Sequence, residues 1–167
     1  MIILGLGSNK GDRFANLQQA ISALSAFMEN IRCSPVYESA ALLPEEAPRE
    51  WDIDFLNMAL CGTTQLTPQE LLAELKTIEK DLGRTATGHW GPREIDIDIL
   101  GFDDKVVVEK HLVIPHQYLL VRDFALIPLA DIAPDWLYPA KGEFYGMKVK
   151  ALAGNLISGL TRTDFVL

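Results

Sequence analysis

Two aspartates, Asp96 and Asp98, stand two residues apart in the segment REIDIDIL at residues 93–100. The isoleucines that alternate with them predict a β-strand, in which residues i and i+2 point to the same face of a sheet. Two such residues are roughly 6.6 Å apart along the strand, so both carboxylates can converge on one ligand. Carboxylate oxygens are ligands that Mg²⁺ takes together with waters and substrate phosphates. The spacing therefore indicates a hard-cation site, although it does not by itself separate one metal-dependent phosphoryl transfer from another.

A solvent-exposed strand face is the alternative explanation of these aspartates, because antiparallel sheets often have one polar side. Aspartate is a poor strand former, however, and two carboxylates so close together repel each other, which favours the cation site. Arg84 and Arg93 frame the loop that precedes the strand, and Trp90 lies within that loop. Because a guanidinium pairs with phosphate oxygens through a planar fork, we expect both arginines to hold a phosphate beside the aspartates.

The bulk properties of the chain are those of one globular domain, which we place at residues 1–167. Hydrophobic residues make up 49% and charged residues 23%, and the net charge of −8 argues against a nucleic-acid-binding surface. Cys33 and Cys61 are expected to be free thiols in a reducing compartment. The N-terminus has no basic region before its short apolar run, and no segment is long enough to span a membrane. We therefore expect a cytoplasmic protein.

The order of the predicted elements indicates the fold. Strands are predicted at residues 2–6, 31–38, 55–62 and 93–100, and helices at about 12–28 and at 67–83. This β-α-β-β-α-β order is typical of the α+β, ferredoxin-like sandwich, with helices on one face of an antiparallel sheet. The site is then expected on the other face, and the rest of the chain forms a C-terminal extension.

Finer features of the elements are also predicted. Pro35 cannot donate to a strand ladder, so the strand at 31–38 is expected at a sheet edge. The acidic connection at 40–54 is long enough to suggest a functional loop. A hairpin around Asp103 is expected to lead into the segment KVVVE. Residues from 112 onward look less regular, apart from a short helix at 147–155, and the tail from Asp135 is assigned to packing.

Side-chain alternation assigns residues to the two faces of the sheet. Ile95, Ile97 and Ile99 should pack under the helices, which leaves Asp96 and Asp98 on the open face. The first strand should point its leucines to one face and the bare backbone of its glycines to the other. In the third strand, Phe55 and Asn57 are two residues apart and are therefore expected to point to the same face of the sheet.

With these residues in place, the chain resembles the 6-hydroxymethyl-7,8-dihydropterin pyrophosphokinase family of the folate pathway. The motifs that carry the resemblance are LGSNKGD at 6–12, FLN at 55–57, IEKDLGR at 78–84, WGPREIDIDIL at 90–100, IPH at 114–116 and RDFAL from residue 122. They cover nearly the whole chain and occur in the family order. The resemblance implies transfer of the terminal pyrophosphoryl group of ATP to the hydroxymethyl group of the pterin, with release of AMP.

The resemblance also implies roles for single residues. Asp96 and Asp98 would hold two Mg²⁺ ions that bridge the triphosphate, and Arg84 and Arg93 would complete the catalytic set. The residues implied in ATP binding are Glu79, Arg84, Trp90, Arg93, Ile99, His116 and Arg122. The residues implied in pterin binding are Leu42, Phe55, Asn57, Asp96 and Phe124. The expected partners of a monomeric chain are the small-molecule substrates ATP and 6-hydroxymethyl-7,8-dihydropterin, with no nucleic acid and no membrane. The loops at 7–12, 43–54 and 84–91 are expected to close over these substrates.

Two other classes of protein fit part of this pattern. A metal-dependent nucleotidyltransferase or phosphohydrolase would use the same aspartates, but it would lack partners for a pterin ring, against which Asn57 and Phe124 speak. A non-enzymatic ferredoxin-like binding domain would carry the aspartates on a solvated strand and would show no Mg²⁺-dependent ATP binding.

Overall fold

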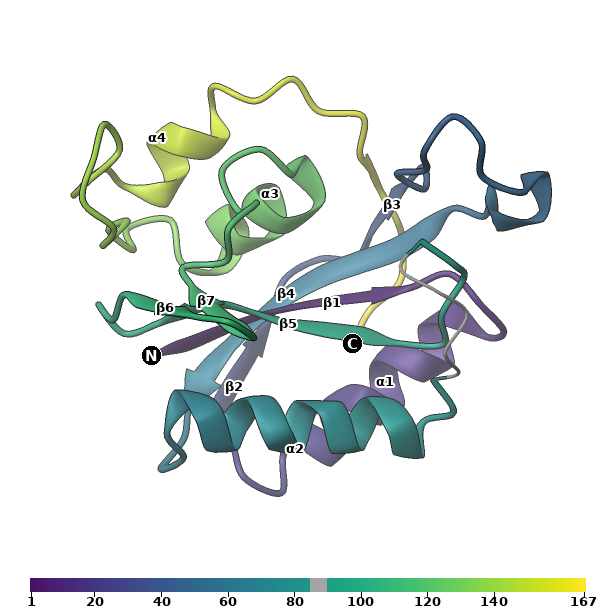
Figure 1. Ribbon diagram of the computed structural model, residues 1–167, viewed down its shortest axis with the longest axis horizontal. Coiled ribbons are helices and arrows are strands. Elements are labelled where there is room, and N and C mark those ends of the chain that lie inside the picture. Colours follow the sequence, from purple (N-terminus) through teal and green to yellow (C-terminus); the bar gives the residue numbers. More distant parts are fainter. Residues whose placement is uncertain (85–89) are drawn as a thin grey trace.

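The computed structural model describes residues 1–84 and 90–167, and Figure 1 shows the arrangement of their elements. The main sheet is built from β1 (Ile2–Ser8), β2 (Glu29–Cys33), β3 (Tyr37–Ser39), β4 (Phe55–Thr63), β5 (Asp96–Phe102) and β8 (Thr161–Arg162). The strands follow the order β5-β1-β4-β3-β8, with β2 also paired to β4, and every pairing is antiparallel. The predicted ferredoxin-like β-α-β-β-α-β order is therefore confirmed.

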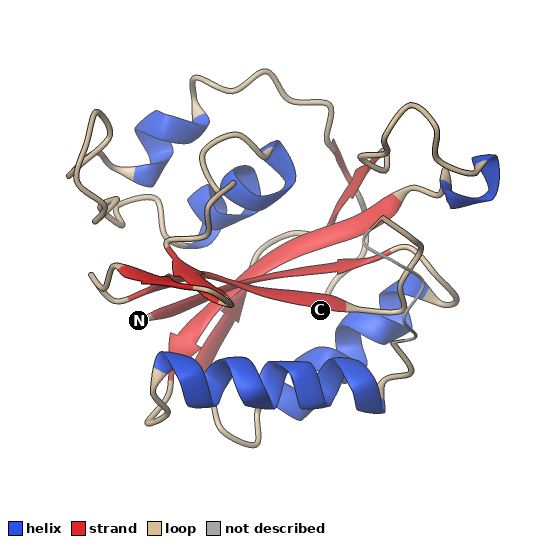
Figure 2. Cartoon of the chain, in the orientation of Figure 1, coloured by secondary structure: helices blue, strands red, loops and turns tan. Residues whose placement is uncertain are grey.

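Helices cover both faces of this sheet, as Figures 1 and 2 show. On one face lie α1 (Arg13–Leu24) and α2 (Pro68–Asp81), which bury a core with the alternating apolar residues of β1, β4 and β5. Asp12 caps α1, and Thr67 with Glu70 forms the predicted capping box of α2. On the other face α3 (Asp123–Ile132) and α4 (Val149–Ala153) enclose a second core over part of the sheet. The uncovered remainder of that face holds the candidate site.

The main difference from the sequence prediction is α3, which lies in the stretch that we expected to be irregular. Its residues Ala125, Leu126 and Leu129 are buried against the sheet. The helix is apolar on most sides and contains Pro128, so it lacks the one-sided stripe that marks an amphipathic helix. The short helix expected at 147–155 is confirmed as α4.

Two strand predictions also need correction. Pro35 divides the expected strand at 31–38 into β2 and β3. Among the described residues β2 pairs only with β4, as expected of an edge strand, whereas β3 is not an edge strand because β8 pairs with its outer side. The segment KVVVE does not return along β5: β6 (Val107–Glu109) pairs instead with β7 (Leu112–Ile114) as a separate hairpin. Leu112 and Ile114 are buried in the first core, so tertiary packing decides this pairing.

The register of the central strands brings the candidate residues into one row. Gly7 of β1 lies opposite Asn57 of β4 on one side and opposite Asp96 of β5 on the other. Gly5 lies in the same way opposite Asp98. Because both central residues are glycines, β1 places no side chain of its own between the aspartates and Asn57, and the side chains of Leu100 and Phe55 pack against the glycine backbone.

Candidate active site

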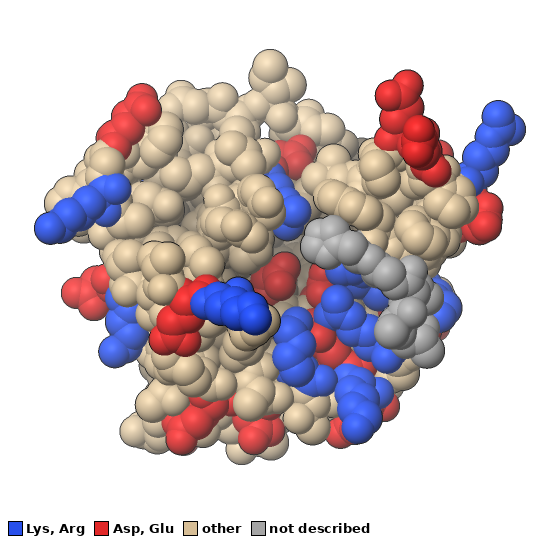
Figure 3. Space-filling model, viewed as in Figure 1, with Lys and Arg blue, Asp and Glu red and all other residues tan. Residues whose placement is uncertain are grey.

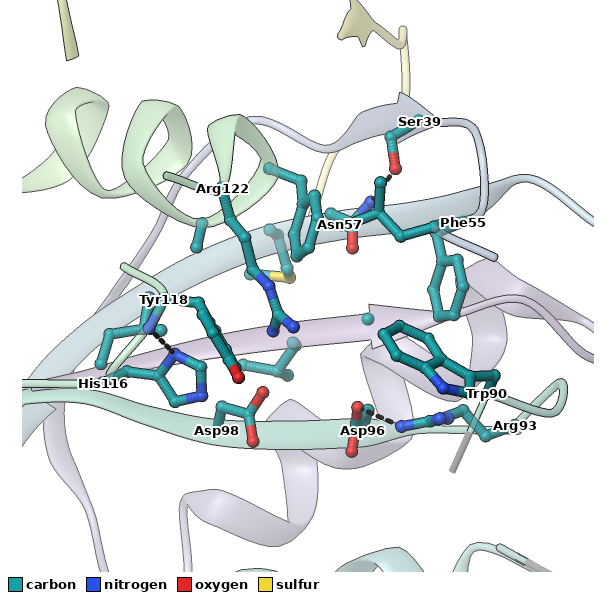
Figure 4. Close-up of a pocket in the computed structure, with 18 of the residues that line it drawn as sticks. Ser39, Phe55, Asn57, Trp90, Arg93, Asp96, Asp98, His116, Tyr118 and Arg122 are labelled. Carbon is teal, nitrogen blue, oxygen red and sulfur yellow. Dashed lines mark hydrogen bonds and ion pairs between the residues drawn. The ribbon is translucent and has the colours of Figure 1, made fainter. Parts of the chain in front are cut away.

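A cavity of about 330 Å³ opens on the face of the sheet that α3 leaves uncovered. Figure 3 shows a hollow near the middle of the side of the molecule that it draws, with Lys and Arg side chains beside it and acidic side chains within it. The predicted site residues that line the cavity are Leu42, Phe55, Asn57, Arg84, Trp90, Arg93, Asp96, Asp98, His116, Arg122 and Phe124. Figure 4 shows Asp96 and Asp98 pointing from β5 into the same space. The alternation argument therefore placed both aspartates on the correct face.

Asp96 is held between the two predicted arginines. Arg84 Nη1 donates to Asp96 Oδ1 at 2.7 Å, and Arg93 Nη1 donates to Asp96 Oδ2 at 2.7 Å. Burial of the carboxyl opposes its ionisation, but the charges of Arg93 and Arg84 outweigh that effect and lower the pKa of Asp96. Two guanidinium groups thus lie beside one carboxylate, where they can also donate hydrogen bonds to phosphate oxygens.

Asp98 is in the opposite electrostatic situation. No hydrogen bond or ion pair to its carboxylate occurs among residues 1–84 and 90–167. Burial, and then repulsion from Asp96, raise the pKa of Asp98 above its ordinary value. A cation in contact with Asp98 would stabilise its ionised form, and no side chain in the described part of the chain provides one.

Hard-cation chemistry fits this pair of carboxylates. A divalent cation would relieve the repulsion between Asp96 and Asp98, and both offer oxygen ligands. No third His, Cys, Asp or Glu joins them in a metal-binding group within the part of the chain that the structure describes. A cation held here would thus keep coordination positions for water or substrate oxygens, as Mg²⁺ does beside phosphates.

The buried residue Glu79 organises the arginine side of the cavity from below. Its carboxylate is ion-paired with Arg84, accepts from Lys76 Nζ at 2.9 and 3.0 Å, and accepts from the backbone N–H of Ile97 at 2.8 Å. Glu79 is only 2% exposed and does not line the cavity itself. The structure therefore places it behind Arg84, as a support for the arginine.

An apolar and amide-bearing wall faces the aspartates across the cavity. Asn57, on β4, donates from Nδ2 to Ser39 Oγ at 2.9 Å, and Phe55 lies beside it (Figure 4). A Cβ atom at Gly7 would come within 3.1 Å of Asn57 Oδ1, so glycine is needed there to leave the amide in place. An amide with a ring beside it suits a flat heterocycle with polar edges.

The third side of the cavity comes from the segment around α3. The guanidinium of Arg122 lies over the ring of Tyr118, 4.5 Å from its centroid, and also near Phe124. His116 Nδ1 accepts from the backbone N–H of Tyr118 at 3.3 Å, which leaves the proton of the neutral ring on Nε2. Burial, and then the charge of Arg122, lower the pKa of His116 to about 4. His116 is therefore a neutral hydrogen-bonding group at physiological pH.

Ile99 does not reach this cavity. It is buried against the helices and borders a second hollow of about 270 Å³, together with His116 and Asp98. The two hollows share these last two residues as well as Lys76 and Gln117, so they adjoin each other.

Sequence reasoning assigned no site role to several other residues that line the cavity, among them Ser39, Lys76 and Tyr118. Lys76 could have been found from its i,i+3 spacing to Glu79 on α2. The other two carried no signal that distinguishes them from ordinary loop residues. The central part of the loop at 84–91, for which closure was expected, lies outside the described residues.

Fold and site together define a class: an enzyme on a ferredoxin-like sheet that handles a phosphorylated substrate beside two carboxylates. The profile of the 7,8-dihydro-6-hydroxymethylpterin-pyrophosphokinase (HPPK) family matches residues 3–134. The chain belongs to this family.

Relatives with the same description are found in distant bacteria. The chain is 44% identical over 142 residues to a 2-amino-4-hydroxy-6-hydroxymethyldihydropteridine pyrophosphokinase of Aquifex aeolicus, with 83% of each chain covered. It is 40% identical over 143 residues to the protein of that name from Synechocystis, covering 84% of this chain and 70% of the relative. A folate synthesis bifunctional protein of Chlamydia muridarum is 39% identical, but this chain spans only 34% of its length.

Solved structures agree on the fold. The wild-type HPPK-DHPS of Plasmodium falciparum superposes with a TM-score of 0.65 at 17% identity, over 92% of this chain and 44% of that one. An HPPK-DHPS in complex with substrates gives a TM-score of 0.67 at 16% identity, over 92% and 42%. At these identities the likeness shows the shared fold.

No helix in the described parts of the chain is both long and apolar enough to cross a bilayer.

Proposed function

We propose that this chain catalyses the reaction of its family, transfer of the pyrophosphoryl group of ATP to 6-hydroxymethyl-7,8-dihydropterin, as a step of folate biosynthesis. Family membership makes it an ATP-dependent diphosphotransferase. The observation that carries the proposal for this particular site is the single cavity in which Asp96, Asp98, Arg84 and Arg93 face Asn57 and the ring of Phe55. One end of the cavity suits phosphates and the other suits a pterin ring.

We assign the pterin end to Leu42, Phe55, Asn57 and Phe124, with Asp96 at its border. The amide of Asn57 offers hydrogen-bonding groups to a ring edge, and the two aromatic rings offer faces for stacking. All five residues line the cavity. Because Asp96 lies opposite Gly7 and Gly7 lies opposite Asn57, a flat ring can rest on bare backbone between them.

We assign the nucleotide end to the cationic side and to the adjoining hollow. Arg84, Arg93 and Arg122 neutralise phosphate charge, while Trp90 and His116 contribute a ring face and a neutral N–H group. Ile99 lines the adjoining hollow, where the flat face of the adenine base can pack against it. Glu79 acts in this scheme by holding Arg84.

Asp96 and Asp98 are the residues that would hold Mg²⁺, and we propose two ions. When bound, the ions supply neutralisation of triphosphate charge and fix the phosphate oxygens in place. Arg84 and Arg93, which pair with Asp96 here, can also donate N–H groups to phosphate oxygens.

The chain's own residues act mainly by positioning and by charge neutralisation. The pterin hydroxyl oxygen forms a bond to the β-phosphorus, and the bond from that phosphorus to the α,β-bridging oxygen breaks. AMP leaves with that electron pair, and the hydroxyl proton is released. The arginines stabilise the charge on the transferred group, and the apolar wall keeps water away from it.

A coupled assay for AMP release tests this function. ATP and Mg²⁺ are supplied with and without 6-hydroxymethyl-7,8-dihydropterin. AMP that forms only with the pterin supports the proposal, whereas ADP formation or pterin-independent hydrolysis supports another phosphoryl transfer. No nucleotide turnover at all would contradict an enzymatic role. A monomeric state and a cytoplasmic location stay predictions, which sedimentation and cell fractionation test.

A further inference from the structure

Arg13 breaks a local rule at the start of α1. It is the first residue of that helix, whose first turn contains no acidic residue. A helix N-terminus carries partial positive charge, so a cation there is unfavourable by roughly 0.3–1 kcal/mol. A residue that violates a local preference is expected to gain something elsewhere in the structure.

The gain is visible in the contacts of the Arg13 guanidinium. Its Nη1 donates to Glu38 Oε1 at 2.8 Å and to the backbone carbonyl of Asp54 at 2.7 Å. Glu38 lies in β3, just before the long acidic connection at 40–54, and Asp54 is the last residue of that connection. One nitrogen atom therefore bridges the two ends of a 15-residue loop, in addition to the β3–β4 pairing of the flanking residues Ser39 and Phe55.

The residues next to Glu38 and Asp54 form part of the cavity wall that we assign to the pterin. The residue after Glu38 is Ser39, whose hydroxyl accepts from the amide of Asn57. The residue after Asp54 is Phe55, which lines the cavity beside Asn57. Leu42, which we assign to the pterin, lies in the connection itself.

We propose that Arg13 is a positioning residue for the pterin substrate: it fixes the two ends of the 40–54 connection and so preforms the wall that the pterin contacts. Arg13 is not among the residues that line the cavity, so it acts through Glu38 and Asp54. The inference rests on the proposed function for the identity of the substrate, but not for the link between Arg13 and the loop. A preformed wall lowers the ordering cost of binding.

The experiment compares four variants of the full chain. Arg13→Met removes both hydrogen bonds and keeps the aliphatic stem, while Arg13→Lys keeps a cationic donor. Glu38→Gln weakens one of the two bonds by removing its charge. Arg32→Met removes an exposed arginine of β2 and is the matched control. For each variant, kcat, the KM values for pterin and for ATP, and hydrogen exchange of the 40–54 peptides are measured.

We expect Arg13→Met to raise the pterin KM about fivefold, a modest coupling between distant groups, while the ATP KM stays within about twofold. Exchange in the 40–54 peptides should quicken in the same variant. Arg13→Lys should lie close to the wild type in both measurements, Glu38→Gln should lie between the wild type and Arg13→Met, and Arg32→Met should match the wild type. If Arg13→Met does not fold, Glu38→Gln carries the same comparison.

Two results would overturn the inference. One is exchange of the 40–54 peptides in Arg13→Met that equals exchange in the wild type. The other is an equal rise of both KM values together with a lower melting temperature, which indicates general destabilisation. Absence of pterin-dependent AMP formation by the wild type would reject the proposed function instead, and the exchange data would still decide whether Arg13 holds the loop.

Discussion

The carboxylate of Glu79 accepts a hydrogen bond from the backbone N–H of Ile97, 2.8 Å away, and so ties α2 to the start of β5. Ile97 lies between the two aspartates of the candidate site. The same carboxylate pairs with Arg84, which itself pairs with Asp96. One buried acid therefore fixes both the strand that carries the aspartates and one of their arginines.

Replacement of Glu79 by alanine should destabilise the protein by about 1–3 kcal/mol, because it leaves the buried N–H of Ile97 without its acceptor and removes the carboxylate that pairs with Lys76 and Arg84. The measurement is urea unfolding of both proteins. Glu74→Ala on the exposed side of the same helix is the control and should change stability by less than about 0.5 kcal/mol. Similar losses in both variants would show that Glu79 has no special structural role.

Asp98→Ala should nearly abolish turnover while the fold stays intact. The neighbouring carboxylate and burial already disfavour the ionised form of Asp98, so its loss removes repulsion and should not lower the melting temperature. Removal of a ligand for the proposed cations should lower kcat by at least about a thousandfold, or roughly 4 kcal/mol. AMP release and thermal melting measure the two effects, and Asp104→Ala on the exposed turn after β5 is the control. An unfolded Asp98→Ala protein would contradict the assignment of its carboxylate to the open face.

The arrangement around β5 was predictable from the sequence because its alternation is strict. Ile95 and Ile97 are fully buried, and Asp96 and Asp98 line the cavity, as period-two alternation requires. The capping box at Thr67 was equally readable, since its hydrogen bonds lie within one helical turn. Where a signal is local and periodic, sequence and structure agree.

The remaining features depend on contacts between distant segments. The pairing of β6 with β7 follows from burial of Leu112 and Ile114, which no local pattern reveals. The helix α3 was missed because it contains Pro128 and because its apolar residues cover most of its surface. The hydrogen bonds of Arg13 to both ends of the 40–54 connection were equally unpredictable from the sequence, since Asp54 accepts through its backbone carbonyl. Such contacts appear only when the chain is folded.

His116 should make stability depend on pH. Its pKa is about 4 in the folded protein and near 6.5 when unperturbed, so the unfolded chain binds the proton more tightly. The contribution of neutral His116 to the unfolding free energy is fully present above pH 6.5 and is lost as the pH falls toward 4. The loss is about 3 kcal/mol at most, and less because the ring is partly exposed.

Urea unfolding of the wild type and of His116→Gln at pH 7.5 and at pH 4.5 isolates this effect. The wild type should lose about 1–3 kcal/mol more than the variant on going to the lower pH, because glutamine does not titrate. Equal losses in the two proteins would mean that the folded protein does not depress the pKa of His116.

Trp136, in the segment after α3, packs against the sheet at Gly101 of β5. A Cβ atom there would lie 2.9 and 3.0 Å from two ring carbons of Trp136 and 3.3 Å from Ile3 Cδ1. The indole cannot easily move away, because its Nε1 donates to the carbonyl of Asp103 at 3.0 Å. Gly101→Ala should therefore cost about 1–3 kcal/mol of unfolding free energy through overpacking.

Gly159→Ala is the matched control for this substitution, because an added Cβ at Gly159 meets no atom within 4 Å. It should leave the unfolding free energy unchanged or raise it slightly through a stiffer unfolded chain. Trp136→Leu combined with Gly101→Ala should cost less than the sum of the two single changes, since the smaller side chain frees the space that the new methyl group needs. Strictly additive costs in urea unfolding would show that Trp136 does not confine Gly101, and the tail would then contribute to stability through its other contacts alone.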